Sequence, residues 1–98
     1  MELTQIPEAF QSRLRLMIIS ALTMGKKSFN ELKSITCATD GNLSVQISKL
    51  EQWGYLTVAK AFVNKKPITT CELTPSGLSD FKDYVEMLNA ILSTPEEP

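Results

Sequence analysis

The sequence predicts one small α+β domain, mainly helical, in which three helices are followed by a β-hairpin and a fourth helix. Apolar residues recur at three- and four-residue spacing in four separate segments, which indicates amphipathic helices. Between the third and fourth segments, two runs rich in β-branched residues flank a polar turn, which is typical of a hairpin. With 98 residues there is room for one domain. We expect it to span residues 1–92, followed by a flexible tail at residues 93–98.

The first helix is expected to run from Pro7 or Glu8 to Leu22 or Thr23. Proline suits the first turn of a helix, and a carboxylate there is favoured by the helix dipole. Gly25 follows the last apolar position and is expected to end the helix.

The second helix is short and begins after Ser28, with Glu31 three residues later as its partner in a capping box. Its apolar face consists of Phe29, Leu32 and Ile35. The third helix starts at Thr39 or Asp40, since both are good N-caps, and stops at Gly54. Its inward side chains are Leu43, Ile47 and Leu50.

The hairpin is expected from a strand at residues 55–63, a polar turn at residues 64–67 and a second strand at residues 68–73. Thr74 and Pro75 then open the last helix as its N-cap and first residue. A short helix, a tight turn, a longer helix and a hairpin outline a winged helix-turn-helix. In that fold the third helix reads DNA and the hairpin forms the wing.

The net charge of −1 and the pI of about 5.4 do not by themselves indicate a DNA-binding protein. The distribution of charge along the chain supports the winged helix-turn-helix better. From Lys26 to Lys66 there are seven lysines and three carboxylates, which gives +4 and leaves −5 in the flanks. A basic segment on a nearly neutral protein fits a face that binds phosphates. A chance fluctuation is the alternative.

The sequence contains no signature of catalysis. There is no histidine, and Cys37 and Cys71 form no CxxC motif, which excludes zinc sites of the familiar spacings and a Cys–His nucleophile. The four glycines are scattered, so there is no glycine-rich phosphate loop. We therefore expect a binding protein and no enzyme, with no metal or cofactor. The two cysteines are interpreted as buried, inert thiols, with a redox switch as the alternative.

The N-terminal sequence and the apolar stretches favour a cytoplasmic protein. Glu2 stands where the basic region of a signal peptide would begin. The longest apolar stretch, around residues 16–22, is too short to span a membrane. No membrane partner is expected.

The candidate reading surface is the outer arc of the third helix. Small polar residues stand there, where a purely solvated helix usually carries glutamate and lysine. Asn and Gln can bond bidentately to adenine, and valine can touch a thymine methyl group. Gly41 lets backbone N–H groups approach a phosphate. The expected contacts to DNA from this helix are Asn42, Ser44, Val45, Gln46 and Lys49.

The hairpin supplies a second set of candidate contacts, which would hold the DNA backbone or the minor groove. A charged edge that deters sheet aggregation is the alternative. These residues are Lys60, Asn64, Lys65 and Lys66.

Several runs together resemble the small MarR/ArsR-like winged-helix transcriptional regulators of bacteria and archaea. They are residues 29–33 (FNELK), 39–44 (TDGNLS), 50–56 (LEQWGYL), 60–62 (KAF), 66–69 (KPIT) and 73–77 (LTPSG). The resemblance implies a homodimer that binds operator double-stranded DNA and regulates transcription. It also implies that the third helix faces the major groove and that Lys65 and Lys66 lie on the wing. Val45 and Gln46 stand where such proteins often carry arginine and histidine.

The ends of the chain carry more apolar residues than one small core needs, which independently favours a dimer. Pairing them across a two-fold axis would place two reading helices one DNA turn apart, about 34 Å. A monomer whose ends pack on each other is the alternative. The expected interface residues are Leu3, Ile6, Phe10, Tyr84, Met87, Leu88, Ile91 and Leu92.

Two other functions fit the same fold. The acidic pI and the apolar ends would suit a winged helix that binds another protein. A redox or ligand sensor would use Cys37 or Cys71 as its trigger, or an effector that the sequence does not identify.

Overall fold

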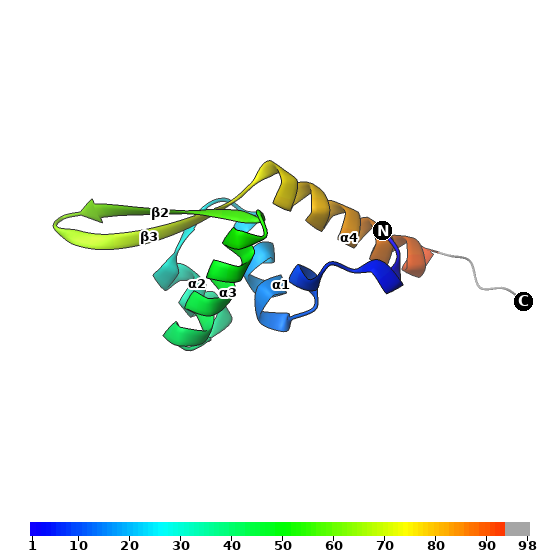
Figure 1. Cartoon of the computed structure of the whole chain (residues 1–98), viewed down its shortest axis with the longest axis horizontal. Helices are drawn as coiled ribbons and strands as arrows, with labels where there is room; N and C mark the ends of the chain where they lie inside the picture. The colour runs from blue at the N-terminus through cyan, green and yellow to red at the C-terminus, as the bar shows by residue number, and fades with distance from the viewer. Residues whose placement is uncertain (94–98) are drawn as a thin grey trace, which may run out of the picture.

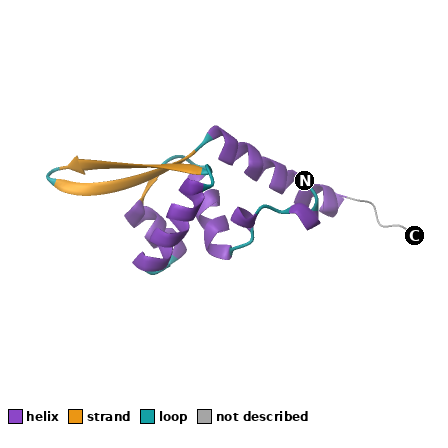
Figure 2. Cartoon of the chain, viewed as in Figure 1, coloured by secondary structure: helices purple, strands orange, loops and turns teal. Residues whose placement is uncertain are grey.

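The computed structural model describes residues 1–93, which form four α-helices, two short 3₁₀ turns and a three-stranded antiparallel sheet (Figures 1 and 2). The predicted order of three helices, a hairpin and a fourth helix is confirmed. The elements are η1 (Leu3–Gln5), η2 (Glu8–Phe10), α1 (Arg13–Leu22), β1 (Lys27–Ser28), α2 (Phe29–Thr36), α3 (Asp40–Gln52), β2 (Leu56–Val63), β3 (Lys66–Leu73) and α4 (Pro75–Ser93).

The first helix begins later than predicted, at Arg13 instead of Pro7 or Glu8. Ser12 is its N-cap, with extended backbone angles and a side chain that accepts a hydrogen bond from the N–H of Arg15 at 3.2 Å. Pro7 and Glu8 open the single 3₁₀ turn η2 instead. The same residue types favour the start of either kind of helix, so this local signal did not distinguish them.

Hydroxyl side chains cap the helices on both sides of the helix-turn-helix turn. The predicted capping box is confirmed: the Oγ of Ser28 accepts from the N–H of Glu31, and the Glu31 carboxylate accepts from the N–H of Ser28, both at 3.1 Å. Thr39 caps α3 by accepting from the N–H of Asn42 at 3.2 Å. Asp40 is the first residue of α3 and not its cap.

Asp40 has a different role at the start of α3. Its carboxylate lies 2.6 Å from the Nζ of Lys33 on α2, and both side chains are exposed. An exposed ion pair of this kind adds little stability, about 0–1 kcal/mol. It does offset the negative charge of Asp40 at the N-terminal end of α3.

β2 and β3 pair from Leu56 opposite Leu73 to Val63 opposite Lys66, with β1 on the other edge of β3. Lys66 and Pro67 therefore belong to β3, so the turn is shorter than predicted. Only residues 64 and 65 remain in the turn, with φ angles of 52° and 65°. Positive φ at both central positions is the pattern of a type I′ turn, which matches the twist of a hairpin.

The core lies where α1, α2 and α3 meet the base of the sheet. Two predictions from the sequence are corrected here. Ile35 is 46% exposed, although it was expected on the apolar face of α2. Cys37 is exposed, while Cys71 is buried as expected. The largest fully buried side chains are Ile18, Ile19, Leu32, Leu43, Leu50, Leu56 and Cys71.

The molecule is elongated, 64 × 25 × 21 Å, because the hairpin and α4 extend in opposite directions from the core (Figure 1). The helix α4 includes Ser93, which was expected in the flexible tail; the rest of that tail, residues 94–98, lies outside the described residues. In the part of the chain that the structure describes, none of the helices combines the length and the hydropathy that a membrane span requires.

Candidate nucleic-acid interface

The outer side of α3 carries the residues predicted to contact DNA. Leu43, Ile47 and Leu50 are buried, which turns the side chains between them away from the core. Among the predicted residues Gln46 is half-buried and the other four are exposed. We call this set the reading face; it consists of Asn42, Ser44, Val45, Gln46 and Lys49.

Arg15 of α1 lies behind the reading face, and its side chain is only 8% exposed. Its Nε and Nη2 donate to the backbone carbonyls of Ala9 and Glu8, at 3.3 and 2.8 Å. Its Nη1 donates to the Oε1 of Gln46 at 2.8 Å. The guanidinium carbon also lies 5.4 Å from the ring centre of Trp53, within the range of a cation–π contact. Sequence reasoning missed Arg15, because its partner Gln46 lies 31 residues away in the sequence and the residues around Arg15 carry no local signal of the contact.

Gln46 is hydrogen-bonded at both ends of its amide. Its Oε1 accepts from Arg15, and its Nε2 donates to the Oδ1 of Asn42 one turn earlier, at 3.3 Å. The sequence predicted Gln46 as a reader of bases. In the structure its side chain is already held by two neighbours.

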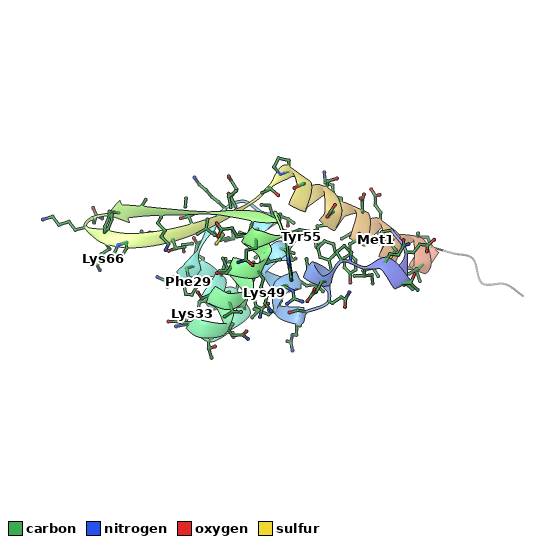
Figure 3. All side chains as sticks on the ribbon, viewed as in Figure 1. Met1, Phe29, Lys33, Lys49, Tyr55 and Lys66 are labelled. Carbon is green, nitrogen blue, oxygen red and sulfur yellow. The ribbon has the colours of Figure 1, made fainter. Side chains whose placement is uncertain are left out.

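The wing, which is the hairpin of β2 and β3, meets α3 at a cleft of about 350 Å³. Lys60 and Thr69 line the cleft from the wing, while Ser44, Ser48 and Glu51 line it from α3. The structure thus brings Lys60 to the same cleft as one residue of the reading face, Ser44. Lys66 stands at the far end of the wing, well away from Lys49 on α3 (Figure 3).

Cys71 lies in β3 at the base of the wing and is fully buried. Burial raises the pKa of its thiol to about 11, with a smaller contribution from the charge of Glu51. At neutral pH the side chain is therefore a neutral thiol packed in the core.

The residues predicted to form a dimer interface fall into two groups. Phe10 is 3% exposed and belongs to an aromatic cluster of its own chain, with ring centres 5.6 Å from Tyr55, 6.0 Å from Phe81 and 4.9 Å from Tyr84. Met87 is buried and Ile6 and Tyr84 are half-buried. The exposed group is Leu3, Leu88, Ile91 and Leu92.

A helix-turn-helix with a polar outer face, followed by a hairpin that carries lysines, defines a winged-helix DNA-binding domain. The chain matches the family model described as "Winged helix DNA-binding domain" over residues 14–92, and it belongs to that family. The fold predicted from the sequence is thereby confirmed.

The chain is also similar to individual proteins of known sequence or structure. The chain is 35% identical over 78 residues to an uncharacterized protein of Methanocaldococcus jannaschii, covering 78% of this chain and 84% of the relative. It is similar to the solved structure of a transcriptional regulator homologue from Pyrococcus horikoshii OT3, with 29% identity, a TM-score of 0.74 and coverage of 81% of this chain and 79% of that one.

The expected resemblance to regulators of the MarR type is confirmed at the level of the fold. A proposed MarR-family transcriptional regulator from Enterococcus faecalis V583 superposes with a TM-score of 0.72 at 20% identity. The match covers 81% of this chain and 72% of that one.

Proposed function

We propose that this protein regulates transcription by binding specific duplex DNA as a homodimer, with α3 in the major groove and the wing on the backbone or in the minor groove. The observation that carries the proposal is the cleft in which Lys60 of the wing and Ser44 and Ser48 of α3 line one surface. A DNA strand against this surface would meet the hydroxyl groups of Ser44 and Ser48 and the charge of Lys60, with the carboxylate of Glu51 in the same cleft. Membership of the DNA-binding family supports the same conclusion.

Within this proposal the reading face and the wing have different roles. Base edges are read by Asn42, Ser44, Val45 and Gln46, because amide, hydroxyl and methyl groups can distinguish bases in the major groove. Phosphates are held by lysines, whose charge attracts any sequence equally. The phosphate contacts are Lys49, Lys60, Lys65 and Lys66, with Asn64 beside them in the turn.

The dimer is supported by the exposed apolar residues at the end of the molecule opposite the wing. Leu92 is 83% exposed, and Leu3, Leu88 and Ile91 are exposed with it. Figure 1 places the N-terminus beside the second half of α4, so these residues lie at one end. Phe10 packs against aromatic residues of its own chain. The proposed interface therefore depends on the four exposed apolar residues.

Salt dependence tests the phosphate contacts. The affinity for a duplex selected from a random library should fall steeply with salt, and Lys66→Ala should lower the slope of log affinity against log salt by about one per wing. Fluorescence anisotropy measures both quantities. Lys82→Ala, an exposed lysine of α4, is the matched control and should leave the slope unchanged. The proposal fails if no duplex binds at low salt.

Redox control of the same site is a second candidate, and the structure narrows it to one cysteine. Cys37 is exposed at the turn between α2 and α3, whereas Cys71 is enclosed in the core. An oxidant that changes DNA binding in the wild type should therefore have no effect on Cys37→Ser. Equal responses of the two proteins would remove this candidate.

A further inference from the structure

We infer that Arg15 is a positioning residue that decides which hydrogen-bonding atoms the reading face offers to a base, and thereby selects guanine over adenine. The inference rests on the proposed DNA-binding function. It starts from the chain of contacts that runs from Arg15 through Gln46 to Asn42. Arg15 itself is buried behind α3 and does not reach the surface that would meet DNA.

The first step is the orientation of the Gln46 amide. A guanidinium group only donates hydrogen bonds, so the atom of Gln46 that lies 2.8 Å from Arg15 must be the oxygen. Arg15 is held in place by the carbonyls of Glu8 and Ala9 and by the ring of Trp53. Turning the amide over would set its NH₂ group against a buried cation.

The second step transmits this orientation to Asn42. With its oxygen toward Arg15, Gln46 points its NH₂ group at Asn42, 3.3 Å away. The atom of Asn42 that receives this hydrogen bond must be the oxygen, and the NH₂ group of Asn42 then points away from Gln46. One buried arginine therefore orients two amides in succession.

The third step concerns the base. An amide binds adenine bidentately when its oxygen accepts from N6 and its NH₂ group donates to N7. Here the oxygen of Gln46 faces Arg15 and the oxygen of Asn42 faces Gln46, so the groups left to meet DNA are N–H donors. Guanine offers two adjacent acceptors, O6 and N7, while cytosine offers only a donor. The pair Asn42–Gln46 thus favours guanine, in place of the adenine contact that the residue types alone suggest.

Selection from a random duplex library tests the inference with the full-length chain. The wild type should enrich guanine over adenine by about tenfold at one position of each half-site, within the range expected for a good base contact. Arg15→Gln should reduce that ratio to about threefold or less, because a glutamine can donate or accept and no longer fixes the amide of Gln46. Arg13→Gln, the same change at an exposed position of α1, is the control and should keep the ratio. An unchanged ratio in Arg15→Gln would overturn the inference.

A second variant leaves Arg15 in place and reverses the pattern. Gln46→Glu keeps an acceptor for Arg15 but removes the donor that faces Asn42. Asn42 should then turn its NH₂ group toward residue 46 and present its oxygen, so that guanine enrichment is lost and the bases that offer an amino group, cytosine and adenine, are gained at the same position. Continued selection of guanine by this variant would contradict the proposed chain of orientations.

A measurement without DNA separates this inference from the proposed function. In the free protein, NOEs should connect the side-chain NH₂ protons of Gln46 to the side chain of Asn42, and Arg15→Gln should weaken them. If no duplex is bound, the proposed function fails and these NOEs still decide the orientation. NOEs from the Gln46 NH₂ group to the guanidinium protons, stronger than those to Asn42, would refute it.

Discussion

Gly77 holds the corner where the wing returns to the helices. A Cβ atom at this position would overlap the backbone carbonyl of Tyr55. The hydroxyl of Thr74 accepts from the N–H of Gly77 at 2.9 Å and donates to the carbonyl of Gly54 at 2.6 Å. These contacts join the end of α3 to the start of α4, so a residue with no side chain is required at the point of closest approach.

Gly77→Ala should lower the free energy of unfolding by about 1–3 kcal/mol, because an added methyl group must displace backbone and not a flexible side chain. Urea unfolding measures the change. Gly41→Ala is the matched control: its Cβ meets no atom within 4 Å. Inside α3 it should be neutral or stabilising by up to about 1 kcal/mol. Equal effects at the two glycines would contradict the steric explanation.

The two cysteines should differ sharply in reactivity. Cys71 is fully buried, and its pKa is raised to about 11, so almost no thiolate is present at pH 8. Cys37 is exposed. A thiol-reactive chromophore at pH 8 should therefore modify one cysteine per native chain and two in denaturant. Cys37→Ser should abolish the native reaction, and a fast second modification in the folded protein would argue against the buried position of Cys71.

At the scale of elements, the wing carries a turn that its sequence does not favour. Asn64 tolerates positive φ well. Lys65 has a φ of 65°, and its side chain is sterically unfavourable in this left-handed region. Asn-Gly is the usual sequence for this turn. In the proposed function this lysine supplies a cation at the tip of the wing.

Lys65→Gly should accordingly stabilise the protein by about 0.5–1 kcal/mol while it weakens binding to every duplex alike. Thermal unfolding gives the first quantity and anisotropy titration the second. Lys65→Asn, which also tolerates positive φ, should show both effects with a smaller gain in stability. A glycine variant that binds DNA as tightly as the wild type would show that this lysine does not contact phosphate.

Helix caps could be predicted from the sequence because they depend on residues within four positions of one another. Ser28 with Glu31 was recognised in this way and is confirmed. For α3 the sequence left Thr39 and Asp40 as alternative caps, and the structure has Thr39. The start of α1 was not, since proline and glutamate suit a 3₁₀ turn equally well. Contacts between distant segments left no local signal, which explains why the role of Arg15 was missed.

At the scale of the whole molecule, the proposed dimer depends on the end opposite the wing. The four exposed apolar residues proposed for the interface lie on η1 and the second half of α4. Ile91→Lys should convert the dimer to a monomer, measured by light scattering after gel filtration. DNA affinity should fall with it, because two linked half-sites are no longer bound together. Lys82→Glu, an exposed change earlier on α4, should keep the dimer; a wild-type monomer would refute the proposal.

The fold class could be predicted at this scale because element order depends on local periodicity. The packing of the ends could not. Phe10 and Met87 look like surplus apolar residues in the sequence, yet they are buried within the chain. Gln46 was likewise expected to be available to a base, but α1 packs behind it and Arg15 binds its side chain.

No other element within residues 1–93 covers the outer half of the wing. Residues 59–63 of β2 and the first two residues of β3 are exposed. A two-stranded ribbon without a covered face is only marginally stable in water. Its backbone amides should exchange with deuterium well before those of α1 and α3, since local opening there exposes little apolar surface. In the proposed complex with DNA, contact of the wing with the duplex would also suppress this local opening, and the loss of conformational freedom would reduce the affinity gained from each lysine at the tip.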